Sequence, residues 1–152
     1  MTDDAMDPET ATAFVHQAVP GVGRMGVVVE AIGPGFVRLR MPLEPNRNHI
    51  GTMYAGPLFA IAELPGGILP LSVLQGTVMP IVTNVDITFR RAARSDVTLE
   101  ARLEPAELRR LGDLAVAEGK AVFVLELSVR DEADVEVANT VSTYQLRPVA
   151  SR

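Results

Sequence analysis

Residues 55–75, AGPLFAIAELPGGILPLSVLQ, form the stretch of sequence that decides the fold. They are too many for one β-strand and are apolar on nearly every side, as in a helix buried inside a protein. Pro57 is tolerated in a first helical turn, whereas Pro65 removes a hydrogen-bond donor from the helix interior. The sequence therefore predicts a long buried helix that is kinked or interrupted at Pro65.

This helix carries an isolated carboxylate. The 38 residues from 48 to 85 include one formally charged side chain, Glu63. Burying a charged carboxylate costs several kcal/mol unless the group is paired, hydrogen-bonded or able to reach a water-filled cleft. No lysine or arginine within these residues can pair with it, so burial is expected to raise the pKa of Glu63 toward the range useful to a general base. The alternative is a glutamate at the helix surface that reaches solvent or an arginine of a neighbouring strand.

The segments on either side of this helix show the alternation of half-buried β-strands. Strands are expected over residues 25–32, 36–43, 81–91, 97–104, 115–130 and 134–146. In the third of these strands, one face is expected to present Ile81, Thr83, Val85, Ile87 and Phe89. Residues 8–18 follow the N-cap residue Asp7 and predict a short helix. Residues 105–111 are expected to form at most one helical turn.

The order of these elements predicts the fold class. Strands joined by short turns pair antiparallel, and a helix that is apolar all round needs a sheet to wrap around it. We therefore expect an α+β fold in which an antiparallel β-sheet wraps around a long central α-helix. The chain has 152 residues, of which 47% are hydrophobic and 22% charged. It is expected to form a single domain over residues 1–152, in which residues 1–19 are an acidic segment and a short helix.

Composition excludes several classes of site and partner. The chain has no cysteine and two histidines, His16 and His49, so we expect no disulfide, no thiolate nucleophile and no metal site. The net charge is −5 and no tryptophan is present, which argues against a nucleic-acid partner. The acidic N-terminus differs from a signal peptide, and Glu63 with its neighbouring prolines argues against a membrane span. We expect a cytoplasmic protein without a nucleic-acid or membrane partner.

The loop NHIGTMYAG, residues 48–56, leads into the helix. If the helix begins at Ala55 or Gly56, its first backbone N–H groups are unpaired and lie at the positive end of the helix dipole. They could hold a carbonyl oxygen as it becomes negative, which is the role of an oxyanion hole. Glu63 lies ~12 Å farther along the helix axis than Ala55. A substrate that uses both groups must therefore be extended, and a seam between two subunits could hold it.

The residues of this loop and helix form a known pattern, in which an acid follows nine residues after an aromatic or histidine position. The residues that carry it are Asn48, Gly51, Tyr54, Ala55, Gly56 and Glu63. The pattern resembles that of the hotdog-fold acyl-CoA thioesterases, in their phenylacetic-acid-degradation branch, and the resemblance covers residues 20–147. Residues 82–96 are similar to the strand of that family that ends in an F-x-R-P-A turn. Three residues depart from the family, since Tyr54 replaces a histidine, Ala55 a glycine and Glu63 the commoner aspartate.

The resemblance implies hydrolysis of an acyl-CoA thioester to the free acid and CoA. Glu63 would act as general base or nucleophile, and the N–H groups of Ala55 and Gly56 would polarise the carbonyl. Asn48 would orient water or the carboxylate. Hotdog proteins generally pair their sheets, which implies a homodimer or a dimer of dimers with sites at the subunit interface. Coenzyme A would enter as part of the substrate, and no other cofactor is expected.

A basic cluster offers a site for the nucleotide end of CoA. Guanidinium groups bind phosphates well, and Arg90, Arg91 and Arg94 form the densest group of arginines. The alternative is a solvated strand end at which nearby acids balance these charges, namely Asp86, Asp96 and Glu107. The residues expected to bind substrate are His49, Gly51, Tyr54, Asn84, Arg90, Arg91 and Arg94.

Two other functions stay open at this point. His49 lies 14 residues before Glu63, a spacing similar to that of hotdog dehydratases of 3-hydroxyacyl thioesters, although the proline-glycine signature of those enzymes is missing. A loop histidine without a catalytic role is the alternative for His49. A non-catalytic hotdog protein would bind acyl groups in an apolar tunnel and release no thiol.

Overall fold

The computed structural model describes residues 6–150, and within them six strands form one antiparallel sheet in the order β1-β2-β4-β5-β6-β3. The strands are β1 (Val28–Gly33), β2 (Phe36–Met41), β3 (Val78–Phe89), β4 (Val97–Arg102), β5 (Ala121–Asp131) and β6 (Glu136–Pro148). The helices are α1 (Pro8–Ala18), α2 (Pro20–Met25), α3 (Ala55–Glu63), α4 (Pro65–Leu74) and α5 (Pro105–Glu118), with a short 3-10 turn at Glu44–Asn46. The expected α+β fold is confirmed.

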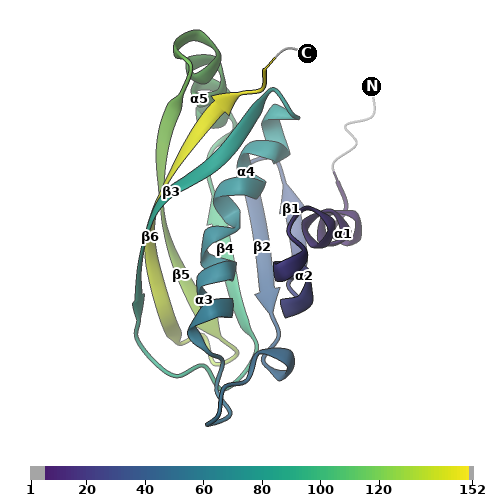
Figure 1. Cartoon of the computed structure of the whole chain (residues 1–152), viewed down its shortest axis with the longest axis vertical. Helices are drawn as coiled ribbons and strands as arrows, with labels where there is room; N and C mark the ends of the chain where they lie inside the picture. The colour runs from purple at the N-terminus through teal and green to yellow at the C-terminus, as the bar shows by residue number, and fades with distance from the viewer. Residues whose placement is uncertain (1–5, 151–152) are drawn as a thin grey trace.

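The helices α3 and α4 run end to end in front of the sheet, and α1 and α2 lie beside β1 (Figure 1). The sheet curves around α3 and α4, so its inner face and these helices share the hydrophobic core. Fully buried members of that core include Val37, Leu39, Ile61, Leu69, Leu99 and Leu146. Residues 55–75 therefore organise the fold as the sequence predicts.

Pro65 interrupts the central helix at the expected place. α3 ends at Glu63, and α4 begins at Pro65 after the single joining residue Leu64. The N–H groups of Gly67 and Ile68 both donate to the Leu64 carbonyl, at 3.0 and 3.1 Å, so hydrogen bonding starts afresh after the break. The break makes Glu63 the last residue of its helix.

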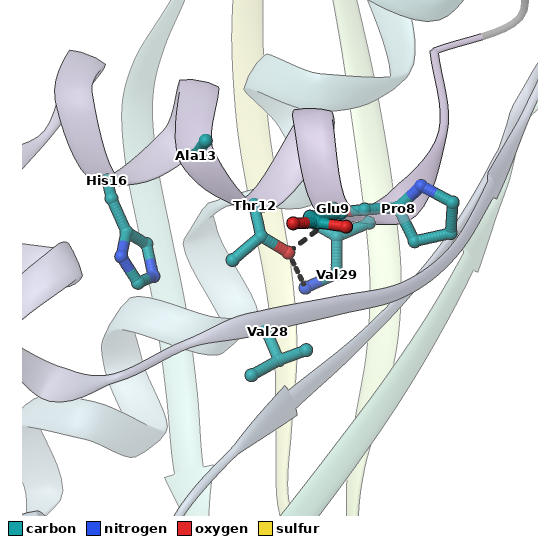
Figure 2. Close-up of a pocket in the computed structure, with 7 residues that line it drawn as sticks. All are labelled: Pro8, Glu9, Thr12, Ala13, His16, Val28 and Val29. Carbon is teal, nitrogen blue, oxygen red and sulfur yellow. Dashed lines mark hydrogen bonds between the residues drawn. The ribbon is translucent and has the colours of Figure 1, made fainter.

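Helix α1 covers the free edge of β1. The Thr12 hydroxyl accepts a hydrogen bond from the Val29 N–H at 2.9 Å and donates to the Pro8 carbonyl at 2.8 Å (Figure 2). His16 Nε2 donates to the Val27 carbonyl at 2.7 Å. These contacts occupy backbone groups that an edge strand otherwise leaves open to other chains. The groove of about 530 Å³ between α1 and β1 is therefore a packing seam, in which His16 has a structural role.

Two segments depart from the predicted element bounds, because a helix extends into the start of a predicted strand. Residues 105–118 form the four-turn helix α5 instead of at most one turn, since Leu108, Leu111 and Ala115 are buried along one helical face. The strand expected from residue 115 therefore begins at Ala121. Near the N-terminus, residues 20–25 form α2 and the strand expected from residue 25 begins at Val28.

A bulge in β3 changes which residues share a face. Val82 lies opposite Tyr144 and Asn84 lies opposite Thr143, so Thr83 is an extra residue between them. As a result, Ile81 lies on the outer face of the sheet, while Val85 lies on the inner face. The prediction of one shared face from Ile81 to Phe89 is therefore wrong for Ile81.

Residues 55–74 are long and apolar enough to cross a membrane, by length and composition alone, with a mean hydropathy of 1.6. In this fold 56% of that segment is buried inside the protein. The sheet covers it, and the break at Leu64 divides it. It is the core helix of this fold.

Candidate functional site

Glu63 lies on the least covered side of α3. Gly56, Phe59 and Glu63 follow one another at spacings of three and four residues, so they share one helical face. Phe59 is 43% exposed on that face, whereas Ile61 and Ala62 on the other sides are fully buried. Glu63 is half-buried, and burial raises the pKa of its carboxyl group above the ordinary value of 4.5. Among residues 6–150 it forms no ion pair, so within that part of the chain no cation offsets the cost of burying the carboxylate.

The first backbone N–H groups of α3 have no side-chain cap within the described residues. Tyr54 is the N-cap residue, and no described side chain caps the helix. The N–H groups of Ala55 and Gly56 therefore have the positive potential and the free hydrogen-bonding capacity that an oxyanion hole needs. The Tyr54 ring covers Gly56 so closely that a Cβ atom on Gly56 would lie 2.5 Å from Tyr54 Cε2. Glycine at this position thus allows Tyr54 to form a wall at the helix start.

Asn48 and Gly51 shape the loop before this helix. The Asn48 Oδ1 atom accepts hydrogen bonds from the N–H groups of Ile50 and Thr52, both at 3.0 Å, and its Nδ2 donates to the Thr52 hydroxyl. Gly51 has a φ of +82°, a left-handed conformation that favours glycine. The Asn48 side chain thus holds the loop together, and one of its two Nδ2 hydrogens is not used in these bonds. The contact with water or the carboxylate that the resemblance implies stays a prediction.

The arginine cluster lies beside this loop. The Met53 N–H donates to the Ala93 carbonyl at 2.9 Å, which joins the segment before α3 to the segment that carries Arg90, Arg91 and Arg94. All three arginines are exposed and form no ion pair within the described residues. The cluster is therefore close in space to the positive end of α3.

Two of the acids that could have balanced these arginines pair elsewhere. Asp96 accepts hydrogen bonds from Arg40 Nη1 at 3.0 Å and from a backbone N–H. Glu107 binds Arg110 on its own helix. Asp86 is exposed and forms no ion pair among residues 6–150. The alternative of a balanced strand end is thus wrong for Asp96 and Glu107.

Two other expected site residues lie away from Glu63. Asn84 is exposed on the outer face of β3, opposite Thr143, while α3 covers the inner face of the sheet. His49 is exposed in the loop before the start of α3, whereas Glu63 is the last residue of that helix. The helix has nine residues and is ~13 Å long, so its length separates the loop from Glu63. Within the described residues of one chain, His49 and Glu63 form no hydrogen bond or ion pair, and the dehydratase alternative stays a prediction.

The inner face of β6 carries polar groups that the sequence did not predict to face α3. The Tyr144 hydroxyl donates to the backbone carbonyl of Glu63 at 2.9 Å. Thr140 and Ser142 lie on the same inner face of the strand, and their buried hydroxyl oxygens have no hydrogen-bond partner in the described part of the chain. Residues of β6 alternate in the sequence, which predicts that Thr140, Ser142 and Tyr144 share one face of the strand. The alternation does not indicate which of the two faces is buried.

The structure offers few other candidates for a site. A groove of about 570 Å³ lies over the outer face, where β4 and β5 pair at only two positions, and it contains none of the expected site residues. In the part of the chain that the structure describes, no three His, Cys, Asp or Glu side chains are grouped as metal ligands. Glu63 and the start of α3 therefore remain the site with the most specific chemistry.

Solved structures share this fold over nearly their whole length. A protein from Pseudomonas aeruginosa, described as of unknown function and a "probable thioesterase", is 44% identical with a TM-score of 0.86, over 93% of this chain and 95% of that one. A protein of unknown function from Chlorobaculum tepidum is 19% identical, with a TM-score of 0.82 over 97% of this chain and 100% of that one. A thioesterase from Haemophilus influenzae is 16% identical, with a TM-score of 0.74 over 97% of this chain and 94% of that one.

These likenesses show that this chain has the hotdog fold, in which an antiparallel sheet wraps around a long helix. Among curated proteins, none matches the chain in sequence. One family model matches residues 8–146. The chain therefore belongs to the family described as a domain of unknown function, DUF4442.

Proposed function

We propose that this protein hydrolyses acyl-CoA thioesters and that Glu63 is the catalytic carboxylate. The observation that carries the proposal is a half-buried glutamate that has no counter-ion among residues 6–150 and lies on the exposed face of α3, a helix without a side-chain cap at its N-terminus. A carboxylate with a raised pKa is a good proton acceptor, and free N–H groups stabilise an oxyanion. The similar protein from Pseudomonas aeruginosa, described as a probable thioesterase, supports thioester hydrolysis in general. The finer resemblance to the phenylacetic-acid-degradation branch rests on the motif residues alone.

Glu63 could act in either of two ways. As a general base, it takes a proton from water while the water oxygen bonds to the carbonyl carbon, and the C–S bond then breaks to release the CoA thiolate. As a nucleophile, its oxygen bonds to that carbon and expels the thiolate, and water then hydrolyses the anhydride. In both routes the N–H groups of Ala55 and Gly56 stabilise the negative charge on the carbonyl oxygen.

The site is proposed to lie at the seam of a homodimer, either alone or within a dimer of dimers. Glu63 and Ala55 are ~12 Å apart along one helix axis, so one small thioester group cannot touch both ends of the same helix. The sheet edge beside this face is also apolar and uncovered, because Val82 and Phe89 on the inner face of β3 are 37% and 49% exposed. A second copy that covers this edge would bring its own helix start or carboxylate to the substrate.

Arg90, Arg91 and Arg94 are proposed to bind the phosphates of CoA. Their loop is tied to the segment before α3 by the hydrogen bond from Met53 to Ala93, so a thioester carbonyl near the helix start leaves the nucleotide within reach of the arginines. CoA enters this scheme as part of the substrate, and the reaction uses no other cofactor. We place the protein in the cytoplasm, the compartment in which acyl-CoA substrates would reach it.

A thiol-release assay tests the proposed function. The purified chain is given short, medium, long and aromatic acyl-CoAs, and a colour reagent for free thiols follows each reaction. We expect turnover of at least one of these esters above the uncatalysed rate. Binding of acyl-CoA without thiol release on every ester would contradict the proposal and favour a non-catalytic acyl-binding protein.

A further inference from the structure

Tyr144 joins the sheet to the residue that carries the catalytic carboxylate. Its side chain lies on the inner face of β6 and is 1% exposed. Its hydroxyl donates to the backbone carbonyl of Glu63 at 2.9 Å, across 81 residues of sequence. The contact is therefore a long-range tie at the last residue of α3.

The carbonyl of Glu63 is available because the helix breaks there. In an unbroken helix it would accept the N–H of Gly67, four residues later. The Gly67 N–H donates instead to the Leu64 carbonyl, at 3.0 Å. A buried carbonyl without a partner costs about 1–3 kcal/mol, so the Tyr144 hydroxyl fills a position that the break at Pro65 has opened.

The Tyr144 ring is held in place from two sides. It stacks on Phe123 of the neighbouring strand β5, with ring centroids 5.2 Å apart. On the helix side it lies against Gly66, where an added Cβ atom would come within 1.9 Å of Tyr144 Cε1. Glycine is thus the residue at position 66 that lets the tyrosine reach the helix end.

The hydroxyl keeps its proton under ordinary conditions. Burial raises the pKa of Tyr144 to about 12. Tyr144 therefore remains a hydrogen-bond donor throughout the neutral range. Since burial is the cause of the raised pKa of Glu63, the depth at which the end of α3 lies also sets the basicity of the carboxylate.

We propose that Tyr144 is the positioning residue for Glu63, whose place relative to the sheet it fixes through the hydrogen bond to the end of α3. Gly66 has a supporting task, because it makes room for the ring. Tyr144 acts through the backbone and takes no part in bond making or breaking. The expected effect on kcat rests on the proposed function. The effect on the position of Glu63 does not, because the pKa of its carboxyl group can be measured without turnover.

Tyr144→Phe is the direct test, because phenylalanine keeps the ring and removes the hydroxyl. Without the tie, we expect the carboxylate to become more exposed and its pKa to fall toward 4.5, the ordinary value of a glutamate. The pKa is read by NMR titration of carboxyl-labelled glutamate in the whole protein, with Glu63→Gln identifying the signal. We also expect kcat to fall on the order of 10- to 100-fold, as a misplaced catalytic group does, while KM changes little.

Two neighbouring glycines provide a matched pair of variants. Gly66→Ala forces the ring of Tyr144 aside and should lower kcat and the pKa of Glu63 as Tyr144→Phe does. Gly67→Ala adds the same methyl group one residue later, where an added Cβ atom has no neighbour within 4 Å, and should leave both quantities unchanged. Val15→Ala controls for lost stability, because it removes buried apolar atoms from α1, which packs on α2 and β1, and should lower Tm without a change in kcat.

The outcomes separate this inference from the proposed function. If Tyr144→Phe retains the wild-type titration of Glu63 and the wild-type kcat, the positioning role is overturned. If the wild-type protein releases no thiol from any ester, the proposed function fails, and the titration alone then decides the positioning role. A downward shift in the pKa of Glu63 supports it in that case, and an unchanged pKa contradicts it.

Discussion

At the residue scale, the sequence identified Glu63 because its charge is isolated within 38 largely apolar residues. An isolated charged residue in an apolar segment can be recognised from the sequence alone. The asparagine and the glycines of the loop before α3 can be recognised in the same way, because they form a motif. Tyr144 was not visible in this way, because a tyrosine in a strand is ordinary and its partner is a backbone carbonyl 81 residues away. Contacts that depend on tertiary packing leave no local pattern.

The raised pKa of Glu63 predicts the pH dependence of activity. The carboxylate must be ionised to act as a base or nucleophile, so kcat/KM should fall as the pH drops through its pKa. Burial raises that pKa, and the midpoint of the acid limb should therefore lie above 4.5, the ordinary value for glutamate. A pH–rate profile measures it, and a midpoint at or below 4.5 in the profile of kcat/KM would contradict the assignment of Glu63.

The arginine cluster predicts a difference between full-length and truncated substrates. In a variant with Arg90→Ala and Arg94→Ala, the KM for an acyl-CoA should rise by roughly tenfold or more, since charged hydrogen bonds to phosphate contribute about 1.5–3 kcal/mol each. The KM for the same acyl group on N-acetylcysteamine, which has no phosphates, should stay as in the wild-type protein. Equal changes for both esters would show that the arginines act on the fold or on the acyl group instead.

At the element scale, the long central helix, its break and the antiparallel strands follow from the pattern of the sequence. The helix α5 was missed because its apolar positions merge with the alternation of β5 that follows. Leu108, Leu111 and Ala115 have helical spacing, and Gly119 ends the helix with a φ of +87°, so the signal was present but shorter than the strand signal beside it. The bulge at Thr83 could not be predicted, because it depends on which β6 residue lies opposite each residue of β3.

The inner face of β6 predicts a gain in stability. Thr140 is 3% exposed, and its hydroxyl oxygen has no partner in the described part of the chain. Replacing it with the isosteric valine removes a desolvation cost of about 1–3 kcal/mol, which corresponds to roughly 2–4 °C in Tm for each kcal/mol. Thermal unfolding of Thr140→Val should therefore show a higher Tm.

Thr143 provides the control for this prediction, because it lies on the outer face of the same strand and is half-exposed. Thr143→Val should leave Tm nearly unchanged. A lower Tm in Thr140→Val would show that the hydroxyl has a partner, such as an ordered water molecule, that stabilises the wild-type protein.

At the scale of the whole molecule, the uncovered inner edge of β3 predicts a homodimer. Val82→Asp places a charge on this edge, and burying that charge without a partner in a dimer interface is costly. The variant should therefore be a monomer of about 16 kDa. Its thioesterase activity should be low, because the site then lacks the second subunit. Light scattering after size exclusion gives the mass, and circular dichroism checks that the chain still folds.

Val116→Asp is the control for that experiment, since Val116 is 63% exposed on α5. It should leave both the mass and the activity unchanged. A wild-type protein that is monomeric and fully active would rule out a site that needs two subunits.

The catalytic role of Glu63 is tested most directly when Glu63→Gln is compared with the wild-type protein on the best acyl-CoA ester. The amide keeps the shape of the side chain but cannot accept the proton or attack the carbonyl, so kcat/KM should fall by about 10²–10⁴. The variant should remain folded. A folded carboxylate with a raised pKa becomes destabilising as the pH rises from the unfolded to the folded pKa, so Glu63→Gln should have an equal or higher Tm at neutral pH and no advantage at low pH. Wild-type turnover in a folded Glu63→Gln protein would contradict the role of Glu63 as the catalytic carboxylate.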